Sequence, residues 1–359
     1  MSQLRTVQVL GGGAGSSAHV RSLAAGLVAR GVQVTVCAPA GTGRAHGLPV
    51  AGARFVAVPR RSDPAAVAAL RTACTGADIV HAHGLHAAVR AGIALSGRGT
   101  PLVVTWHTRV HAEGTRGRLL RLLERRAARA AAVVLGTSWE LVDRARRRGA
   151  RDARLAAAPI PASRFPGAPD DGKARAELGA VGRPLLVSVA QDGQEALLDA
   201  ARTWRSLDPV PLLAVVGEGP RPGALRRRIA AEGLPVVLAG GADDIGDLLA
   251  AADIAVLAGR GEGGPLLAQE ALRLGIPLVA AQADGLPELV GDAAALVPYG
   301  DAEALAGAVA GLLGDPVRRE RLAESGRARA ARWPTEEDSI AHVLSVYDEL
   351  AQPLAGDRA

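Results

Sequence analysis

A regular alternation of short apolar runs with longer amphipathic stretches constrains the fold of this chain more than any other feature. Buried strands that alternate with helices are typical of a parallel sheet covered by helices on both faces. In the first half, a glycine-rich turn leads from the first apolar run into a helix expected over His19–Arg30, which Gly31 ends. The strands expected there are Val7–Leu10, Val32–Ala38, Phe55–Val58, Ile79–His81, Leu102–Thr105 and Val133–Leu135.

A proline-rich segment divides the chain into two such α/β units. Residues Pro159–Gly172 hold four prolines together with Gly167 and acidic residues, a composition typical of a linker. A chain of 359 residues is long enough for two domains, which we place at residues 1–165 and 166–332, followed by a C-terminal segment at 333–359. The second set of expected strands is Leu185–Val189, Leu212–Val216, Val236–Leu238, Ile254–Leu257 and Leu278–Ala281.

The charge and the cysteines narrow the functional classes. The net charge of +6 comes from arginines interleaved with Asp and Glu, which favours a solvated surface. Without zinc-finger spacing or an RNA-binding aromatic motif, no nucleic-acid partner is expected. Cys37 and Cys74 do not make a disulfide framework, and no apolar stretch is long enough to span a membrane, so we expect a cytoplasmic protein.

One basic stretch is compatible with a contact between the protein and a membrane surface. The stretch Arg116–Arg129 has leucines on one side and many arginines on the other, which is typical of helices that rest on an anionic membrane surface. The alternative is a surface helix of the domain with its leucines in the core, and the pattern favours this alternative. A peripheral location at the inner face of the membrane therefore remains open beside a fully cytoplasmic one.

The most informative segment is Gly259–Ala281, where a strand runs through a glycine-rich loop into a helix with Pro265 near its start. The free amides around Gly264, Leu266 and Leu267 would offer an anion site, helped by the helix dipole. Glycines at 263 and 264 would let a phosphate approach the backbone closely. Glu262 and Glu270 could both face a ligand there; an ordinary loop with a capping and a surface glutamate is an equally good interpretation of the residues alone.

This segment resembles the E-x7-E signature of glycosyltransferase family 4, the retaining GT-B enzymes. Glu262 and Glu270 have the required spacing, and the following GIPLVAAQADGLPELVGDAAALVPYGD, with its L-P-E-L-V run, is also similar to the family. The resemblance implies two Rossmann-like domains facing an interdomain cleft, with the C-terminal helix crossing back to the N-terminal domain. It implies that Glu262 lies beside the donor sugar and that Glu270 binds the ribose hydroxyls.

Other motifs resemble the family in the same order along the chain. The segment VVGEGP, which contains Gly217, is similar to the glycine turn near the nucleotide, and Gly15 in the first loop would approach the donor sugar or its phosphate. The strand end LVVTWHT implies that His107 lies near the donor sugar, whereas we assign His81 to packing and leave His83 open. The donor-binding residues expected from the resemblance are Gly15, Gly217, Arg260, Gly263, Gly264, Leu266, Leu267 and Glu270, with Glu262 and His107 as catalytic residues.

The chain departs from the family at the expected diphosphate site. Family members carry an Arg and a Lys just after the first strand of the second domain, but Ser188–Ala200 reads SVAQDGQEALLDA and holds neither cation. Fixed donors with charge-assisted contacts must stabilise a leaving diphosphate when no metal does so. Arg260 is the nearest candidate substitute, and the family's Pro-Ser before the signature is replaced by Ala258-Gly259.

The resemblance therefore implies a retaining hexosyltransferase, and we expect it to need no metal and no cofactor. It would move a sugar from a nucleoside-diphosphate sugar donor to a hydroxyl acceptor, either a small molecule or a lipid-linked one. A catalytically impaired homologue that binds nucleotide or a partner is the alternative, and the missing cations are its sequence feature. An NAD enzyme is disfavoured because Ser16 replaces the third glycine of the fingerprint and the second strand ends without an acidic residue.

Overall fold

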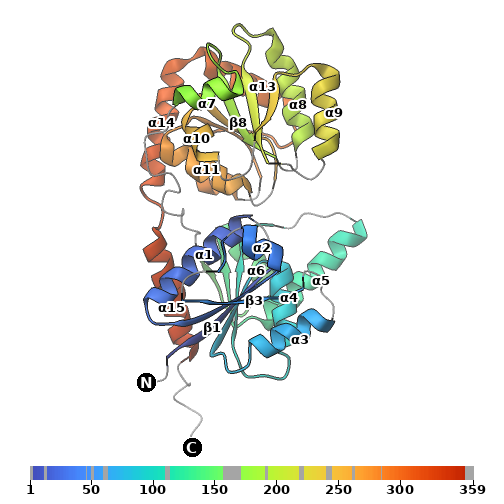
Figure 1. Ribbon diagram of the computed structural model, residues 1–359, viewed down its shortest axis with the longest axis vertical. Helices are drawn as coiled ribbons and strands as arrows, with labels where there is room; N and C mark the ends of the chain where they lie inside the picture. Colours follow the sequence, from blue (N-terminus) through green and yellow to red (C-terminus); the bar gives the residue numbers. More distant parts are fainter. Residues whose placement is uncertain are drawn as a thin grey trace, which may run out of the picture. The chain divides into compact units, whose positions relative to one another are not determined.

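The computed structural model describes residues 3–11, 14–45, 47–49, 52–59, 64–109, 114–156, 171–190, 193–217, 222–239, 245–260, 263–283 and 285–351. The chain divides into two compact units (Figure 1). Unit 1 consists of Met1–Pro161 with Pro334–Ala359, and unit 2 consists of Ala162–Trp333. Each unit is an α/β body built on its own parallel sheet.

The sheet of unit 1 has seven strands in the order β3-β2-β1-β4-β5-β6-β7. All of its neighbouring strands are parallel, and the strand order reverses where β1 lies beside β4. Such a reversal leaves a crevice beyond the carboxyl ends of the strands, where ligands bind in open α/β sheets. The strands are β1 (Arg5–Leu10), β2 (Gln33–Ala38), β3 (Arg54–Ala57), β4 (Ile79–His83), β5 (Leu102–Trp106), β6 (Val133–Gly136) and β7 (Ala153–Leu155).

Helices cover both faces of this sheet. The apolar side chains of α1 and α15 share one core with the sheet, and those of α3 to α6 share the other. The last helix, α15, lies against α1, and a side chain at Gly26 would overlap Ile340, so the glycine permits this close packing. The helices of unit 1 are α1 (Ala14–Ala29), α2 (Ala40–Ala45), α3 (Pro64–Ala73), α4 (Leu85–Ala94), α5 (Gly114–Ala130), α6 (Trp139–Arg147) and α15 (Glu336–Ala351).

The sheet of unit 2 has six parallel strands in the order β10-β9-β8-β11-β12-β13. The order reverses between β8 and β11, which places the crevice beyond these two strands. The strands are β8 (Leu185–Val189), β9 (Leu212–Val216), β10 (Val236–Ala239), β11 (Ile254–Leu257), β12 (Leu278–Ala281) and β13 (Ala295–Val297).

Two apolar cores lie on the two faces of this second sheet. Trp204 is 1% exposed in one of them and donates its indole N–H to the Ala306 carbonyl at 3.2 Å. The helices are α7 (Asp171–Leu178), α8 (Gln194–Thr203), η1 (Trp204–Ser206), α9 (Pro222–Glu232), α10 (Ile245–Ala250), α11 (Gly263–Leu274), α12 (Leu286–Val290), α13 (Ala302–Gly314) and α14 (Pro316–Ala330).

The expected fold class, two doubly wound parallel-sheet units, is confirmed. Two details of the prediction were wrong. The first helix begins at Ala14 rather than His19, so much of the expected loop is its first turn. The strands β7 and β13, each three residues long, were not expected, because so short a run carries no readable periodicity. No helix among the described residues is long and apolar enough to cross a bilayer.

Candidate functional site

The carboxyl ends of β8 and β11 are held unusually close in unit 2. Gly193, the N-cap of α8, has φ +96°, and a Cβ there would lie 2.5 Å from the Ala258 carbonyl oxygen. Only glycine fits both the left-handed backbone and this approach. The two loops that follow the central strands of the sheet therefore touch backbone to backbone at the topological switch point.

Three buried donors without partners lie on β8 or shortly after β8 and β11. Ser188 Oγ, Gln194 Nε2 and Arg260 Nε have no hydrogen-bond partner. In the part of unit 2 that the structure describes, no other buried side-chain polar atom lacks a hydrogen-bond partner. Burying a polar atom unpaired costs about 1–3 kcal/mol, so such atoms are rare in folded proteins and call for a ligand or water. Because Ser188 lies on β8 and the other two follow β8 and β11, this edge of the sheet is the candidate binding site.

Arg260 bridges across the edge of the sheet. It follows β11, and its guanidinium carbon lies 3.7 Å from the ring centroid of Tyr299, which follows β13. A guanidinium over an aromatic face is held by cation–π attraction, which orients it without consuming its N–H donors. Arg260 thus keeps hydrogen-bonding capacity at the place where the sequence analysis expects a substitute cation.

The second glutamate of the signature lies on α11, which begins at Gly263. The Glu270 side chain is 14% exposed, and its carboxylate accepts from Arg273 Nε at 3.1 Å and from the Arg273 terminal nitrogen at 2.5 Å. The ion pair with Glu270 also raises the pKa of Arg273. Arg273 therefore fixes the direction of this carboxylate, while each oxygen keeps a lone pair for a further donor. Glu262 lies outside the described residues, so its part in the site stays a prediction.

The start of α11 defines which amides are free. Because α11 begins at Gly263, the amides of Gly263 and Gly264 have no partner one turn earlier within the helix, whereas the Leu267 amide is far enough along to bond within it. Leu267 is 1% exposed and its side chain packs in the core. Gly217 follows β9 with φ +90°. Donor binding by these residues and by Leu266 stays a prediction.

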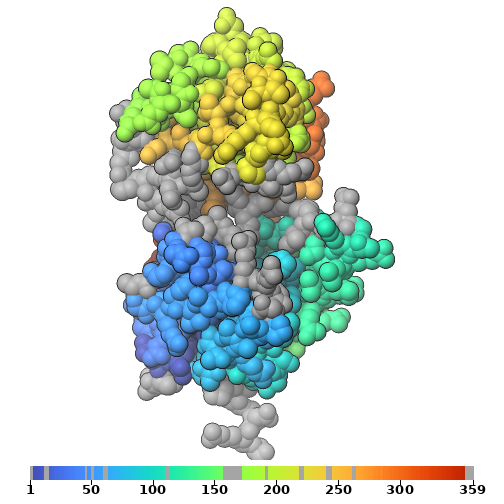
Figure 2. Space-filling view, turned by 45° about the vertical axis from the view of Figure 1, so that its right-hand side comes forward, coloured from blue at the N-terminus to red at the C-terminus, as the bar shows by residue number. Residues whose placement is uncertain are grey.

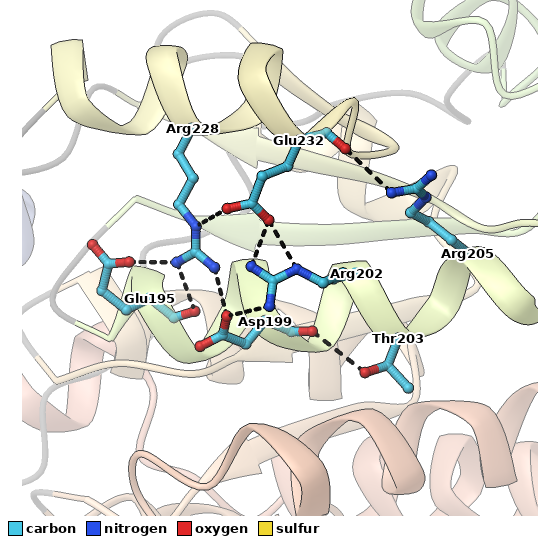
Figure 3. Close-up of polar contacts among 7 residues, drawn as sticks. All are labelled: Glu195, Asp199, Arg202, Thr203, Arg205, Arg228 and Glu232. Carbon is cyan, nitrogen blue, oxygen red and sulfur yellow. Dashed lines mark hydrogen bonds and ion pairs between the residues drawn. The ribbon is translucent and has the colours of Figure 1, made fainter.

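A network of ion pairs joins α8 to α9 (Figure 3). Arg228 binds Glu195, Asp199 and Glu232, and Arg202 binds Asp199 and Glu232. Hydrogen bonds from Arg228 and Arg202 lower the pKa of Glu232. Both guanidiniums are occupied by carboxylates of the same pair of helices, so neither replaces the missing diphosphate cations. That leaves Arg260 as the stronger candidate.

The corresponding edge of unit 1 carries a cluster of histidines. His81 and His83 lie on β4, which ends at His83, and His107 follows β5. The ring centroids of His83 and His107 lie 5.6 Å apart, and His19 from α1 lies 5.3 Å from His107. Burial lowers the pKa of His19 to about 4, and that of His81 to about 3 with a smaller contribution from His19. No group of three or more His, Cys, Asp or Glu side chains in the described ranges is arranged to hold a metal ion.

His81, which the sequence assigned to packing, has polar partners. Its ring nitrogens lie 2.6 Å from the Tyr347 hydroxyl and 2.7 Å from the Thr105 hydroxyl. His107 lies just after β5, at the strand end where it was expected. Its backbone carbonyl accepts a hydrogen bond from the Thr137 hydroxyl at 3.0 Å. Gly15 lies in the first turn of α1, the helix that also carries His19. Contact of Gly15 or His107 with a sugar stays a prediction.

Sequence reasoning missed Arg273, Tyr299 and Gln194 in unit 2, and His19 and Tyr347 in unit 1. The role of Arg273 could have been predicted, because Glu270 and Arg273 lie three residues apart on an expected helix. Tyr299 could not be placed because it follows the unexpected strand β13. Tyr347 lies on the last helix, far along the chain from the strands that it contacts.

Comparison with known proteins identifies the family. Residues 14–161 match the model of a glycosyl transferase 4-like domain, and residues 175–315 match glycosyl transferases group 1. The chain is 31% identical over 284 residues to alpha-D-kanosaminyltransferase of Streptomyces kanamyceticus, a match that covers 70% of this chain and 71% of that protein.

A mannosyltransferase is a second relative, and a solved structure shares the fold. The chain is 32% identical to a Corynebacterium glutamicum GDP-mannose-dependent monoacylated alpha-(1-6)-phosphatidylinositol monomannoside mannosyltransferase, over 48% of this chain and about half (49%) of that protein's length. Anabaena HepE in complex with UDP-glucose has the same GT-B fold, with a TM-score of 0.80 and 21% identity over 96% of this chain and 100% of HepE. The chain belongs to the family of group 1, GT4-like glycosyltransferases.

Proposed function

We propose that this protein is a retaining glycosyltransferase that moves a sugar from a nucleoside-diphosphate sugar to a hydroxyl acceptor. The observation that carries the proposal is the set of buried, unpaired donors Ser188, Gln194 and Arg260 at the carboxyl edge of the unit 2 sheet. A diphosphate is rich in acceptor oxygens and would satisfy all three. Family membership supplies the reaction class, and the two relatives are named as transferases of different sugars.

The donor is proposed to bind on residues 166–332. Its ribose hydroxyls would donate to Glu270, which Arg273 holds in place. Its diphosphate would meet the free amide of Gly264, the guanidinium of Arg260 and the side-chain amide of Gln194. Glu262 would lie beside the sugar, where its carboxylate stabilises the positive charge that develops in the transition state. The sugar and the base are not fixed by these contacts.

Arg260 is proposed to carry the charge that the family's Arg and Lys usually supply. One charge-assisted hydrogen bond contributes about 1.5–3 kcal/mol, so a single cation with good geometry recovers much of what two would give. A homologue that binds nucleotide without efficient transfer is the second candidate, and the occupied state of Arg202 and Arg228 favours it. Donor hydrolysis separates the two, since only an active enzyme cleaves the sugar from its diphosphate.

The first experiment is a panel of UDP-, GDP- and ADP-sugars scored by binding calorimetry and by slow donor hydrolysis. We expect one donor to bind and to be hydrolysed, and Arg260→Ala to weaken its binding roughly 10- to 100-fold. Arg321→Ala, an equal change of charge at an exposed position on α14, is the control and should bind as the parent does. Binding without hydrolysis selects the impaired homologue, and binding to none of the donors refutes the proposal.

The acceptor is proposed to bind on unit 1. If the acceptor is lipid-linked, α5 is the part of unit 1 that would rest on the membrane. Leu119 and Leu122 are 56% and 59% exposed, and α5 projects from the side of unit 1 (Figure 2). The only acidic residue of α5, Glu124, is buried, so the exposed charges of this helix are all arginines. Apolar side chains ringed by arginines fit an anionic membrane.

Flotation with vesicles tests this surface. Vesicles with anionic lipid should carry the protein upward, neutral vesicles should not, and replacing Leu119 and Leu122 with serine should abolish the effect. Flotation that does not depend on the charge of the lipid would show that α5 is an ordinary surface helix, and it would favour a small-molecule acceptor.

A further inference from the structure

A chain of hydrogen bonds leads from the buried core of unit 1 to His107. The Gln8 side chain, at the centre of β1, lies with its carbonyl oxygen 2.9 Å from His83 Nε2. His83 Nδ1 in turn lies 3.4 Å from His107 Nε2. Gln8 is fully buried and His83 is 3% exposed, so water does not compete for these groups. His107 is therefore connected to the core through its Nε2 atom.

The other end of this chain reaches the last helix of the protein. The Gln8 amide nitrogen donates to the Tyr347 hydroxyl at 3.0 Å. That hydroxyl lies 2.6 Å from His81 Nδ1, and His81 Nε2 lies 2.7 Å from the Thr105 hydroxyl. Tyr347, on α15, is fully buried, as is His81. The two branches meet at Gln8, whose oxygen and nitrogen are thereby both occupied.

Neutral imidazoles make this network directional. Burial holds the pKa of both His83 and His107 well below the ordinary value, so each ring carries one proton. An amide oxygen only accepts, so the proton of His83 must lie on Nε2, and its Nδ1 is bare. A bare His83 Nδ1 requires that His107 donate from Nε2. The single proton of His107 is then used, and its Nδ1 is bare as well.

We propose that Gln8 and Tyr347 are positioning residues that hold His107 in the tautomer with a bare Nδ1. Tyr347 acts by accepting from the Gln8 amide nitrogen while it gives its own proton to His81 Nδ1, 2.6 Å away. A hydroxyl whose proton is used in this way cannot donate to a reversed amide, so the Gln8 oxygen stays toward His83. A Gln8 side chain turned by 180° would offer N–H to His83 and would reverse every proton along the chain. The last helix thus sets the hydrogen-bonding character of a residue on β5's carboxyl end.

This tautomer defines the chemistry that His107 can recognise. A bare imidazole nitrogen accepts a hydrogen bond and repels a phosphate oxygen, so the group it binds must be a donor, as a hydroxyl is. This part of the inference rests on the proposed function, in which that hydroxyl belongs to a sugar or to the acceptor. The tautomer itself does not depend on the reaction.

Nitrogen NMR of the imidazoles reads the tautomer directly in the whole protein. With ¹⁵N-labelled histidine, protonated and bare ring nitrogens resonate separately, and the signals that vanish in His107→Gln identify this residue. We expect His107 in the parent to be protonated at Nε2 alone. Tyr347→Phe removes one oxygen atom and should give a mixture of tautomers, as should Gln8→Leu.

A packing control separates this role from a structural one. Val346→Ala opens a cavity on the same helix, since Val346 is fully buried, but keeps the Tyr347 hydroxyl. It should lower stability and leave the His107 tautomer unchanged. Gln8→Leu should also lower kcat about tenfold without changing the donor KM, a loss of the size of one hydrogen bond; Val346→Ala should not.

The outcomes distinguish the two proposals. A His107 protonated at Nδ1 in the parent, or a tautomer that neither Tyr347→Phe nor Gln8→Leu alters, would overturn the inference. If the tautomers behave as expected but no donor is ever cleaved or transferred, the positioning role stands and the proposed function fails.

Discussion

Acidification from pH 7 to pH 5 should destabilise unit 1 and leave unit 2 nearly unchanged. All eight histidines of the chain lie in unit 1, and the sequence Ala162–Trp333 contains none. Within unit 1, His19 and His81 are buried in neutral form, with pKa values lowered by burial to about 4 and about 3. Unit 2 is therefore an internal control within the same molecule.

The magnitude follows from proton linkage. In the unfolded chain an imidazole titrates near pH 6.5, so at pH 5 the unfolded state holds a proton that the folded state does not. Stability is therefore complete above pH 6.5, falls as the pH drops below it, and stops falling only near the folded pKa values of about 4 and about 3. Between pH 7 and pH 5 each group costs about 2 kcal/mol, so His19 and His81 together cost about 4 kcal/mol. Burial also lowers the pKa of His83 and His107, which adds to this loss, so about 4 kcal/mol is the least that unit 1 should lose.

Hydrogen exchange followed by mass spectrometry measures the two units separately. After correction for the intrinsic effect of pH, a loss of at least about 4 kcal/mol should increase the opening equilibrium of the most protected amides of β4 and β5 by at least about three powers of ten. The amides of β8 and β11 should not change. Carboxylates with lowered pKa values, such as Glu232, lose their contribution only below their ordinary value of 4.5 and stay out of this window. Equal protection of unit 1 at the two pH values would refute the view that its histidines are buried and neutral.

Three substitutions test other parts of the structure. Gly193→Ala should destabilise unit 2 by more than the about 1–2 kcal/mol that a left-handed alanine costs, because the new Cβ meets the Ala258 carbonyl. Gly233→Ala is the control, since Gly233 has φ +58° and open space, so only the conformational cost applies there. Equal losses of stability in urea denaturation would deny the close approach at Gly193. Arg273→Ala should weaken donor binding roughly fivefold in calorimetry by releasing Glu270, and an unchanged Kd would show that Glu270 does not bind the donor. Glu124→Gln should cost roughly 3 kcal/mol in thermal unfolding, because Arg144 and Arg148 lose their buried partner, and a loss below 1 kcal/mol would place this pair among surface ion pairs.

The sequence predicted the strands of both sheets where the apolar runs were long. β9 is buried along its whole length and β8 over its first four residues, so nearly every residue had to be apolar or small, and the bounds of both could be predicted closely. The start of α1 was missed because Ala14–Ser17 has no apolar stripe and follows glycines, which favoured a loop. Propensity thus failed where tertiary packing, not local preference, extends the helix.

The site was predictable only where partners are near in sequence or share a motif. The spacing of Glu262 and Glu270 could be read directly, whereas the stacking of Arg260 on Tyr299 joins residues on β11 and β13 through a strand that was not expected. The network of Tyr347, Gln8 and His83 requires knowing that β1 lies beside β4 and that α15 packs on that sheet. No pattern within one segment contains that information.

Ligand protection mapped by hydrogen exchange tests the central proposal most directly. If the carboxyl edge of unit 2 binds a nucleoside-diphosphate sugar, one of the UDP-, GDP- or ADP-sugars should slow exchange in peptides that cover residues 188–194, 217 and 258–270, and Arg260→Ala should remove that protection at the same ligand concentration. Protection elsewhere in the chain alone, or in no peptide with any of the three donors, would contradict it.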